Sequence, residues 1–364
     1  MENIWNKILI WGFTGFILVT GLIFVIKGKN EFSIEERRSL MQKPELTIEN
    51  VSNGSYQNNL EKYLLDQFPG REQLRSIKAK WAYDVMGQRE NNGIYLLKGH
   101  AGKLEYPLNE KSVMNAAKKM KEWQQKYFNE AEVYYSIIPD KNYYLAYQND
   151  YPSIDYDKLK KIMQQEMTNV SYIDIWDLLN EEDYYNTDTH WRQEKLYSVA
   201  DRIVREMGYE DHITNEYELH KVNDFYGVYY GQSALSLSPD ILCYLTNDTI
   251  DSAYVWNLET DSQEGVYNFG DRTLYDKYNI YLGGAAPIQV ITSPLAKTDD
   301  KLIIFRDSFC SSIAPLLTEV YREIVLIDTR YIKPELLGDY VEFRDAKILF
   351  FYNTLLLNNS SVLQ

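Results

Sequence analysis

The hydrophobic pattern of the chain begins with an uncharged run over residues 8–26. As a helix, such a run just crosses the roughly 30 Å hydrocarbon layer of a membrane. A cleavable signal peptide usually has a shorter apolar stretch and a small-residue cleavage site, which the residues after Ile26 do not supply. We therefore predict an uncleaved membrane anchor within residues 1–30. Lys7 before the run and Lys27 and Lys29 after it leave its orientation undecided by charge.

The residues after the anchor change from polar to amphipathic. Residues 31–55 are polar and turn-rich, with the turn signal Asn53-Gly54, and are predicted to form a stalk. From Tyr56 to Met86 apolar residues recur mostly at helical spacing, interrupted at Pro69-Gly70, which fits two helices joined by a turn. We expect the main folded domain to span residues 56–364.

Short apolar runs then alternate with amphipathic segments. Runs typical of strands at 133–138 and 170–173 alternate with helical periodicity at 113–127 and 159–167. This alternation predicts a mostly parallel sheet with helices on both faces, which is a three-layer α/β fold.

The alternation stops between about 211 and 297, where stretches such as Phe225-Tyr226-Gly227 indicate a β-rich insertion. Apolar runs at 301–305, 323–327 and 347–351 then restore the pattern. The sheet is therefore expected to resume after the insertion, within the same domain.

Composition narrows the choice of partners. A net charge of −15 argues against binding to nucleic acid, whose phosphates require a basic surface, and favours a neutral or cationic partner. The four histidines and the two cysteines, Cys243 and Cys310, show no spacing of a metal site, so we expect neither a metal nor another cofactor. Two cysteines are too few to indicate the redox compartment, and we expect free thiols.

The segment Asp188-Thr189-His190-Trp191 precedes a helical pattern that runs from Leu196 to Met207. In a structural interpretation, Asp188 or Thr189 caps this helix and Trp191 joins the core. In a chemical interpretation, the Asp188 carboxylate accepts from one imidazole nitrogen of His190 while the other nitrogen faces a nucleophile.

The segment Arg306-Asp307-Ser308-Phe309 follows the apolar strand and precedes a predicted helix over 313–320. Ser308 thus lies at the carboxyl end of a strand, where α/β sheets bind ligands. It is either a helix cap or a nucleophile beside backbone N–H groups that stabilise an oxyanion. Asp307 is expected to be structural, and Cys310 inside the helix is the weaker candidate nucleophile.

Asp188, His190 and Ser308 together supply the carboxylate, base and hydroxyl of a serine acyl-transfer triad. Further residues near these segments or at strand ends are candidates for oxyanion stabilisation or substrate binding. They are Asn353, Arg330, Arg306 and Trp191. Asn353 is equally suited to a turn, and Arg330 to an ion pair with Asp328.

The motifs resemble the DHHW family and its relatives, the AlgX- and AlgJ-type alginate O-acetyltransferases, in the SGNH-hydrolase-like superfamily. Besides the two segments above, matching stretches occur in the same order along the chain: Asp66-Gln67-Phe68-Pro69-Gly70-Arg71, Asn92-Gly93-Ile94-Tyr95, Phe225-Tyr226-Gly227, Tyr281-Leu282-Gly283-Gly284 and Ile327-Asp328-Thr329-Arg330-Tyr331. The resemblance implies that Asp188, His190 and Ser308 form the triad, in a motif order circularly permuted relative to ordinary SGNH hydrolases. Arg306 stands where the superfamily usually has glycine.

The resemblance also implies a function. Its members are membrane-anchored, face the cell exterior and acetylate exopolysaccharide or cell-wall glycan beside a membrane-bound O-acyltransferase that supplies the acetyl group. Two alternatives stay open: a glycan acetylesterase that uses the same triad, and a non-catalytic glycan-binding or scaffolding subunit of a polysaccharide synthase complex.

Overall fold

The computed structural model describes residues 2–146, 149–210, 213–214 and 216–364. They form two compact units. Unit 1 comprises Met1–Asn92 and Tyr230–Ser236, and unit 2 comprises Gly93–Tyr229 and Leu237–Gln364. Residues 56–92, which the sequence assigned to the main domain, therefore fall in unit 1.

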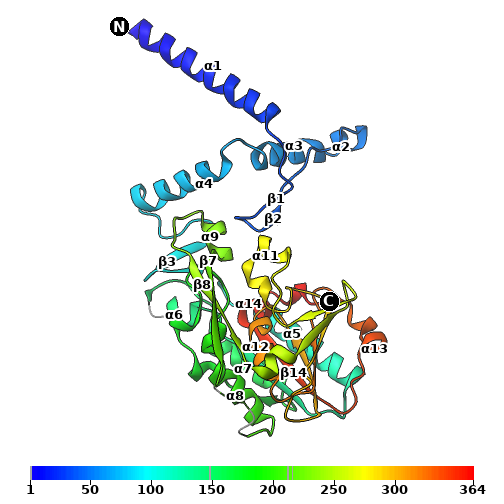
Figure 1. Cartoon of the computed structure of the whole chain (residues 1–364). Coiled ribbons are helices and arrows are strands. Elements are labelled where there is room, and N and C mark those ends of the chain that lie inside the picture. Colours follow the sequence, from blue (N-terminus) through cyan, green and yellow to red (C-terminus); the bar gives the residue numbers. More distant parts are fainter. Residues whose placement is uncertain (1, 147–148, 211–212, 215) are drawn as a thin grey trace. The chain divides into compact units, whose positions relative to one another are not determined.

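Unit 1 begins with the long helix α1 (Glu2–Ile26), drawn in dark blue in Figure 1. Its stretch Ile4–Ile26 is long and apolar enough to cross a membrane, with a mean hydropathy of 2.4, and none of it is buried against the rest of the chain. Length and composition are what identify it as a candidate anchor.

The rest of unit 1 is a short hairpin and a set of helices. Its elements are β1 (Phe32–Ser33), β2 (Arg38–Ser39), α2 (Ile48–Ser52), α3 (Ser55–Asp66), α4 (Arg71–Lys80), the π-helix η1 (Trp81–Val85) and the end of α9 (Val228–Ser233). The segment predicted as a stalk thus contains regular elements. The hairpin is tied to α3 because both terminal nitrogens of Arg38 donate to Asp66, at 2.6 and 2.9 Å, and these bonds hold the pKa of Asp66 below its usual value.

Unit 2 is built on an eight-stranded sheet in the order β10-β9-β11-β13-β12-β14-β5-β6. Strands β13, β12, β14, β5 and β6 are parallel, whereas β11 is antiparallel to its neighbours β13 and β9. The strands are β5 (Val133–Ile138), β6 (Ser171–Tyr172), β9 (Tyr254–Asn257), β10 (Ser262–Gly265), β11 (Ile288–Thr292), β12 (Lys301–Arg306), β13 (Glu323–Ile327) and β14 (Ala346–Asn353). The predicted mostly parallel sheet is confirmed.

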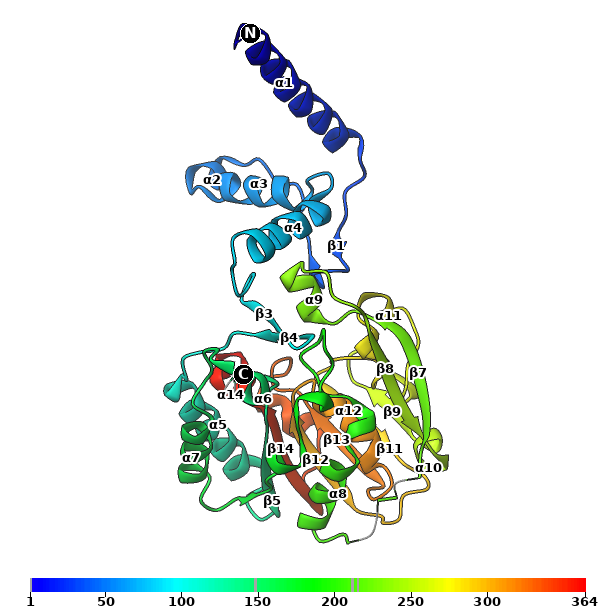
Figure 2. The same cartoon turned by 90° about the vertical axis from the view of Figure 1, so that its left-hand side faces the viewer.

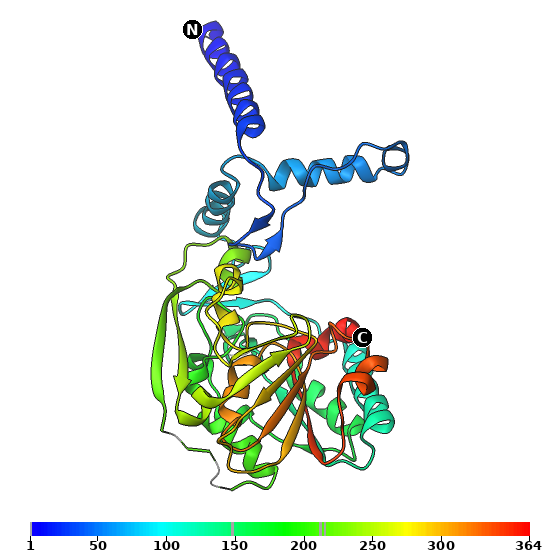
Figure 3. The same ribbon diagram turned by 45° about the vertical axis from the view of Figure 1, so that its right-hand side comes forward.

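Helices cover both faces of this sheet, as Figures 2 and 3 show. Trp123 packs against Phe350 of β14, and Trp191 packs against the next residue, Phe351. Because successive strand residues point to opposite faces, these tryptophans lie in different layers. The helices of unit 2 are α5 (Glu110–Tyr127), α6 (Asn142–Leu145), α7 (Tyr156–Glu166), α8 (Tyr197–Glu206), α10 (Asp248–Ser252), α11 (Arg272–Tyr275), α12 (Cys310–Leu317), α13 (Leu337–Tyr340) and α14 (Thr354–Asn358).

The β-rich insertion contributes to two sheets. Strands β7 (Glu218–Phe225) and β8 (Asp240–Thr246) form an antiparallel pair, whereas β9, β10 and β11 extend the central sheet. A separate hairpin pairs β3 (Ile94–Leu97) with β4 (His100–Lys103). Short 3₁₀ turns complete the chain at η3 (Trp176–Leu178), η4 (Glu181–Asp183), η5 (Gln193–Lys195), η6 (Lys277–Ile280), η7 (Pro334–Leu336) and η8 (Ser360–Val362).

Candidate active site

Asp188, His190 and Ser308 form a continuous chain of hydrogen bonds. Nδ1 of His190 lies 2.6 Å from Oδ1 of Asp188, and Nε2 lies 2.8 Å from Oγ of Ser308. With the proton on Nδ1, the ring donates to Asp188 and accepts from the Ser308 hydroxyl, which is the arrangement that lets a histidine deprotonate a serine. Two residues 118 positions apart in the sequence are thereby brought into contact.

The loop that carries Asp188 and His190 is held from several sides. It closes on itself because the Tyr185 N–H donates to the His190 carbonyl at 3.1 Å. Asp240 accepts from the N–H groups of Asn186 and Thr187, and from the Thr187 hydroxyl at 2.6 Å. The second oxygen of Asp188 accepts from the Val228 N–H at 2.8 Å. These bonds fix the carboxylate before any substrate arrives.

Aromatic rings fix the orientation of the His190 imidazole. The Tyr278 ring stacks on it with centroids 3.9 Å apart and planes 9° from parallel, and Phe309 packs on it at 4.8 Å. The Tyr278 hydroxyl donates to Ser312 Oγ in α12 at 3.0 Å, so the stacking ring is itself fixed. The imidazole is thus confined between groups anchored on different elements.

Ser308 follows β12 and precedes a helix, as predicted. The helix, α12, begins two residues after Ser308 and spans Cys310–Leu317 rather than the predicted 313–320. Within the described residues no side chain caps α12, and Oδ1 of Asp307 accepts from the Phe309 N–H at 3.0 Å in the turn before the helix. Its other oxygen accepts from the Asn353 N–H at 2.7 Å, and burial raises the pKa of Asp307. The Ser308 hydroxyl therefore faces His190 instead of capping the helix.

A pocket of 340 Å³ opens over Ser308. Besides Ser308, its lining includes Lys103, Glu105, Arg330 and Asn353. The pocket is large enough for a small ligand and mixes charged, amide and apolar groups. Ser308 is half-buried, so its hydroxyl is reachable from this pocket.

Asn353 and Arg330 both line this pocket, and both also have structural partners. The Asn353 side chain caps α14 by accepting from the Leu355 N–H at 2.9 Å, and its amide donates to the Ile138 carbonyl at 3.1 Å. Arg330 makes two bonds to Asp328, at 2.6 and 2.8 Å. The two interpretations offered for each residue are therefore compatible.

The structure does not bring Arg306 or Trp191 to the pocket, which corrects the prediction of substrate contact for these two residues. Arg306, the last residue of β12, is 1% exposed because its long side chain turns into the protein, where it donates to Gln289 at 2.6 Å. Trp191 is fully buried, and its indole N–H donates to the Phe309 carbonyl at 2.9 Å and to Ser312 Oγ at 3.0 Å. Both residues support the segment around Ser308.

Both cysteines are free and buried. Burial raises the pKa of Cys310 to about 12, which keeps the thiol protonated at neutral pH. Cys310 also does not line the Ser308 pocket. The structure therefore favours Ser308 over Cys310 as the nucleophile.

Lys141 is a buried lysine that contacts the histidine loop. Its ammonium group donates to the carbonyls of Ala101 and Tyr185, both at 2.7 Å, and of Asn186 at 3.3 Å. Burial lowers its pKa to about 7, an effect partly opposed by Asp188 and Asp240. Lys141 thus ties the hairpin of β3 and β4 to the residues just before Asp188.

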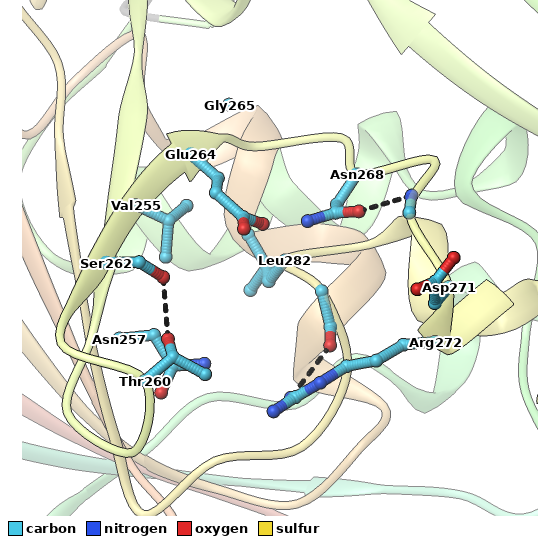
Figure 4. A pocket seen from close by; sticks show the side chains of 12 residues that line it. Val255, Asn257, Thr260, Ser262, Glu264, Gly265, Asn268, Asp271, Arg272 and Leu282 are labelled. Atoms are coloured by element: carbon cyan, nitrogen blue, oxygen red, sulfur yellow. Dashed lines mark hydrogen bonds between the residues drawn. The ribbon is translucent and has the colours of Figure 1, made fainter.

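A second cavity, of 180 Å³, lies in the insertion (Figure 4). Glu264 and Asn268 point into it, and Arg272 donates to the Gly283 carbonyl at 3.2 Å along its wall. None of the three triad residues lines this cavity. The cavity is therefore separate from the site around Ser308.

Sequence reasoning missed several residues that support the site. These residues contact partners that are between 30 and 53 positions away in the sequence, so no local pattern marks them. They are Asp240, Tyr278, Val228 and Lys141. Only Gly227 had a signal, because it belongs to one of the matching stretches of the family resemblance.

No family model and no curated protein matches the sequence. Among solved structures, a DHHW family protein from Eubacterium siraeum aligns with a TM-score of 0.61 and 20% identity, over 75% of this chain and 95% of that chain. Bacillus cereus PatB1, solved with a sulfonyl adduct, aligns with a TM-score of 0.55 and 17% identity, over 72% and 95%. The O-acetyltransferase domain of Pseudomonas putida AlgJ aligns with a TM-score of 0.42 and 12% identity, over 73% and 92%.

The three-layer α/β architecture predicted from the sequence is thus also that of known proteins. The structural resemblance expected from the motifs is confirmed, and the chain has the fold of a DHHW family protein and of PatB1.

Proposed function

We propose that the chain is a membrane-anchored, extracytoplasmic O-acetyltransferase that moves an acetyl group through an acetyl-Ser308 intermediate onto a hydroxyl of an exopolysaccharide or cell-wall glycan. The observation that carries the proposal is the chain of hydrogen bonds from Asp188 through His190 to Ser308, at 2.6 and 2.8 Å, beside a pocket. A hydroxyl so placed is poised for nucleophilic attack.

In the first half-reaction, Ser308 Oγ attacks the carbonyl carbon of an acetyl donor while His190 Nε2 takes the hydroxyl proton. Asp188 stabilises the resulting imidazolium. The tetrahedral intermediate collapses, the donor oxygen leaves with the proton from His190, and the acetyl group stays on Ser308 as an ester.

In the second half-reaction, a glycan hydroxyl gives its proton to His190 and attacks the acetyl carbon. Ser308 leaves as the alcohol after regaining the proton, so the enzyme returns to its starting state. The Ser308 N–H, which has no acceptor within the described part of the chain, and the Asn353 amide are the candidate donors to the oxyanion. Arg330 would contact substrate at the pocket wall.

The source of the acetyl group follows from the location proposed for the site. Acetyl-CoA is cytosolic, whereas α1 would hold the catalytic unit outside the membrane. A membrane-bound O-acyltransferase is therefore the proposed donor and partner. The net charge of −15 favours a neutral or cationic acceptor glycan over a polyanionic one.

The first test measures acetyl transfer by the full-length protein from an activated acetyl ester to candidate oligosaccharides. Acetylated sugar should form, and Ser308→Ala should lower the rate by about 10³-fold or more. Ser171→Ala, at an exposed position of β6, is the matched control and should retain the wild-type rate. After treatment with an aryl sulfonyl fluoride, mass spectrometry should also find an aryl sulfonyl group on Ser308 Oγ, with fluoride lost, since PatB1 carries a sulfonyl adduct.

The two alternative functions give different results. Release of acetate without sugar acetylation, lost in Ser308→Ala, identifies a glycan acetylesterase that uses the same triad. Neither turnover nor labelling of Ser308, together with glycan binding that survives Ser308→Ala, identifies a non-catalytic scaffolding subunit.

A further inference from the structure

Exposed apolar side chains gather in unit 1. Outside α1, 24 large hydrophobic residues of the described chain are exposed, and 11 of them lie within residues 31–92. The remaining 13 are spread over the much longer remainder of the chain. A concentration of this kind on a short segment indicates a surface that meets an apolar environment.

Four of these residues form one continuous face, which we term the apolar face. Leu74 and Ile77 of α4 and Trp81 and Val85 of η1 recur at intervals of three or four residues and are 50%, 63%, 60% and 59% exposed. On the other side of the same helix, Ala79 and Ala82 are buried. The helix is therefore amphipathic with its larger apolar side chains outward, the reverse of a helix that packs on its own protein.

Charge in this region differs from that of the rest of the chain. Residues 27–92 contain 11 lysines and arginines against 10 acidic residues, whereas residues 93–364 contain 26 against 42. Lys78 and Lys80 flank the apolar face, and Arg71, Arg75 and Lys78 stand beside Leu65, Phe68 and Leu74 around a groove of 390 Å³. Arg71 and Arg75 are paired with Glu36 and Glu72, so Lys78 and Lys80 supply the cationic groups beside the apolar side chains. Apolar side chains flanked by lysines match the acyl chains and headgroups of anionic phospholipids.

The end of the anchor is fixed to α3, the helix that precedes the apolar face in the chain. Phe24, near the end of α1, packs edge-on against Tyr63 of α3 with ring centroids 5.7 Å apart. Just beyond, the Asn30 N–H donates to Gln67 at 3.1 Å, and Gln67 donates back to the Asn30 carbonyl at 2.8 Å. Four residues separate the end of α3 from the start of α4. The exit of α1 is thus fixed to the turn that leads into the apolar face.

We propose that the apolar face of α4 and η1 lies in the interfacial layer of the membrane that α1 spans, with lipid as its occupant. The inference rests on the anchoring part of the proposed function. Tryptophan at position 81 and lysines beside it are the residues that favour the boundary between headgroups and acyl chains. Unit 1 would then be held by a second, peripheral contact besides the spanning helix.

The test uses the full-length protein in nanodiscs of phosphatidylcholine, with and without phosphatidylglycerol. An environment-sensitive fluorophore is attached at Ile77→Cys, and for comparison at Met114→Cys, an exposed position of α5. The native thiols are buried, and wild type treated with the same fluorophore measures their background labelling. Emission at position 77 should shift to the blue and be quenched by nitroxide lipids, more strongly with phosphatidylglycerol, whereas emission at position 114 should not change.

Several outcomes would overturn the inference. A water-like emission at position 77 in lipid discs means that lipid does not cover the apolar face. If adding a partner protein then shifts this emission to the blue, the partner protein is the occupant. A shift that appears only with two chains per disc indicates that a second copy of the chain is the occupant.

The double variant Leu74→Gln with Trp81→Gln should reduce the quenching at position 77, while its circular dichroism stays unchanged.

Turnover of the acetyl ester is measured on the same samples. If position 77 stays in water while Ser308-dependent turnover persists, lipid docking fails and the proposed chemistry stands. If position 77 is in lipid but turnover is absent, lipid docking stands and the proposed chemistry fails.

Discussion

At the scale of single residues, the backbone at Gly227 is built against the histidine loop. A Cβ atom at this position would lie 2.3 Å from the Thr187 carbonyl oxygen and 2.4 Å from the Cα of Asp188. The Gly227 N–H donates to Thr187 Oγ1 at 2.8 Å, and the next N–H donates to Asp188. Glycine is required at this position because any Cβ atom would clash with the backbone of Thr187 and Asp188, which cannot move without shifting the triad loop.

Gly227→Ala should therefore displace Asp188. We expect a loss of about 1–3 kcal/mol in unfolding free energy from overpacking, and a fall of about 10²-fold in kcat from the shifted triad. Gly265→Ala is the control, since its Cβ would meet its nearest atom at an ordinary 3.6 Å. Thermal unfolding and acetyl-ester hydrolysis report the two effects. Equal behaviour of both variants would contradict the close packing at Gly227.

Lys141 leads to a pH-dependent prediction. Its folded pKa, lowered by burial to about 7, is far below the value of about 10.4 for an unfolded lysine. Between these values the unfolded chain binds more protons, so the unfolding free energy due to this group rises with pH, and is lowest below pH about 7. The slope approaches about 1.4 kcal/mol per pH unit for one proton.

Lys141→Met should remove this slope. It should also lower kcat by up to about 10²-fold, because the Tyr185 and Asn186 carbonyls lose their donor and the residues before Asp188 shift. Urea unfolding at a series of pH values measures the slope. Lys111→Met, at an exposed position of α5, should keep the wild-type slope and rate. An unchanged slope in Lys141→Met would assign the pH dependence to other groups.

At the scale of elements, the start of α12 is held to the histidine loop by one indole. The Trp191 N–H donates to both Phe309 and Ser312, so the residue after His190 positions the helix after Ser308. The two halves of the triad are therefore coupled by a second connection besides the bond between His190 and Ser308.

Trp191→Phe keeps an aromatic ring but leaves the Phe309 carbonyl without its indole donor. We expect a loss of about 1–3 kcal/mol in unfolding free energy and slower sulfonylation of Ser308. Trp123→Phe, on the opposite face of the sheet, should lose packing energy without slowing sulfonylation. Calorimetry and labelling kinetics measure the two quantities. Equal labelling rates in the two variants would show that Trp191 does not position Ser308.

The elements that the sequence predicts well are those with an uninterrupted local pattern. The apolar run at 133–138 is β5, and the run at 323–327 is β13, because strands buried on both faces need apolar residues throughout. The hairpin of β1 and β2 escaped prediction, since it depends on the distant partner Asp66 rather than on its own polar sequence. Spacing and strand-end position indicated Asp188, His190 and Ser308, whereas long, flexible Arg306 gave no sign of its direction.

At the scale of the whole molecule, the chain passes between its two units three times, at residues 92, 229 and 236. The segment Tyr230–Ser236 is bound within unit 1, where Asn91 donates to the Ser233 carbonyl at 2.7 Å and Arg75 to the Gly231 carbonyl at 2.8 Å. A protein shortened to begin at Gly93 would therefore lose the partners of an internal segment. No compositional boundary in the sequence indicates this arrangement.

The stacking of Tyr278 on His190 makes the proton chemical shifts of this imidazole a measure of the state of the active site. A phenol ring whose centroid lies 3.9 Å from the imidazole shields the ring protons of His190 through its ring current. Of the four histidines in the chain, His220 also stacks on a tyrosine, Tyr244, with centroids 4.8 Å apart, so the upfield imidazole resonance that persists in His220→Gln belongs to His190. Proton magnetic resonance can then follow acylation of Ser308 and arrival of an acceptor through the ring protons of the base itself.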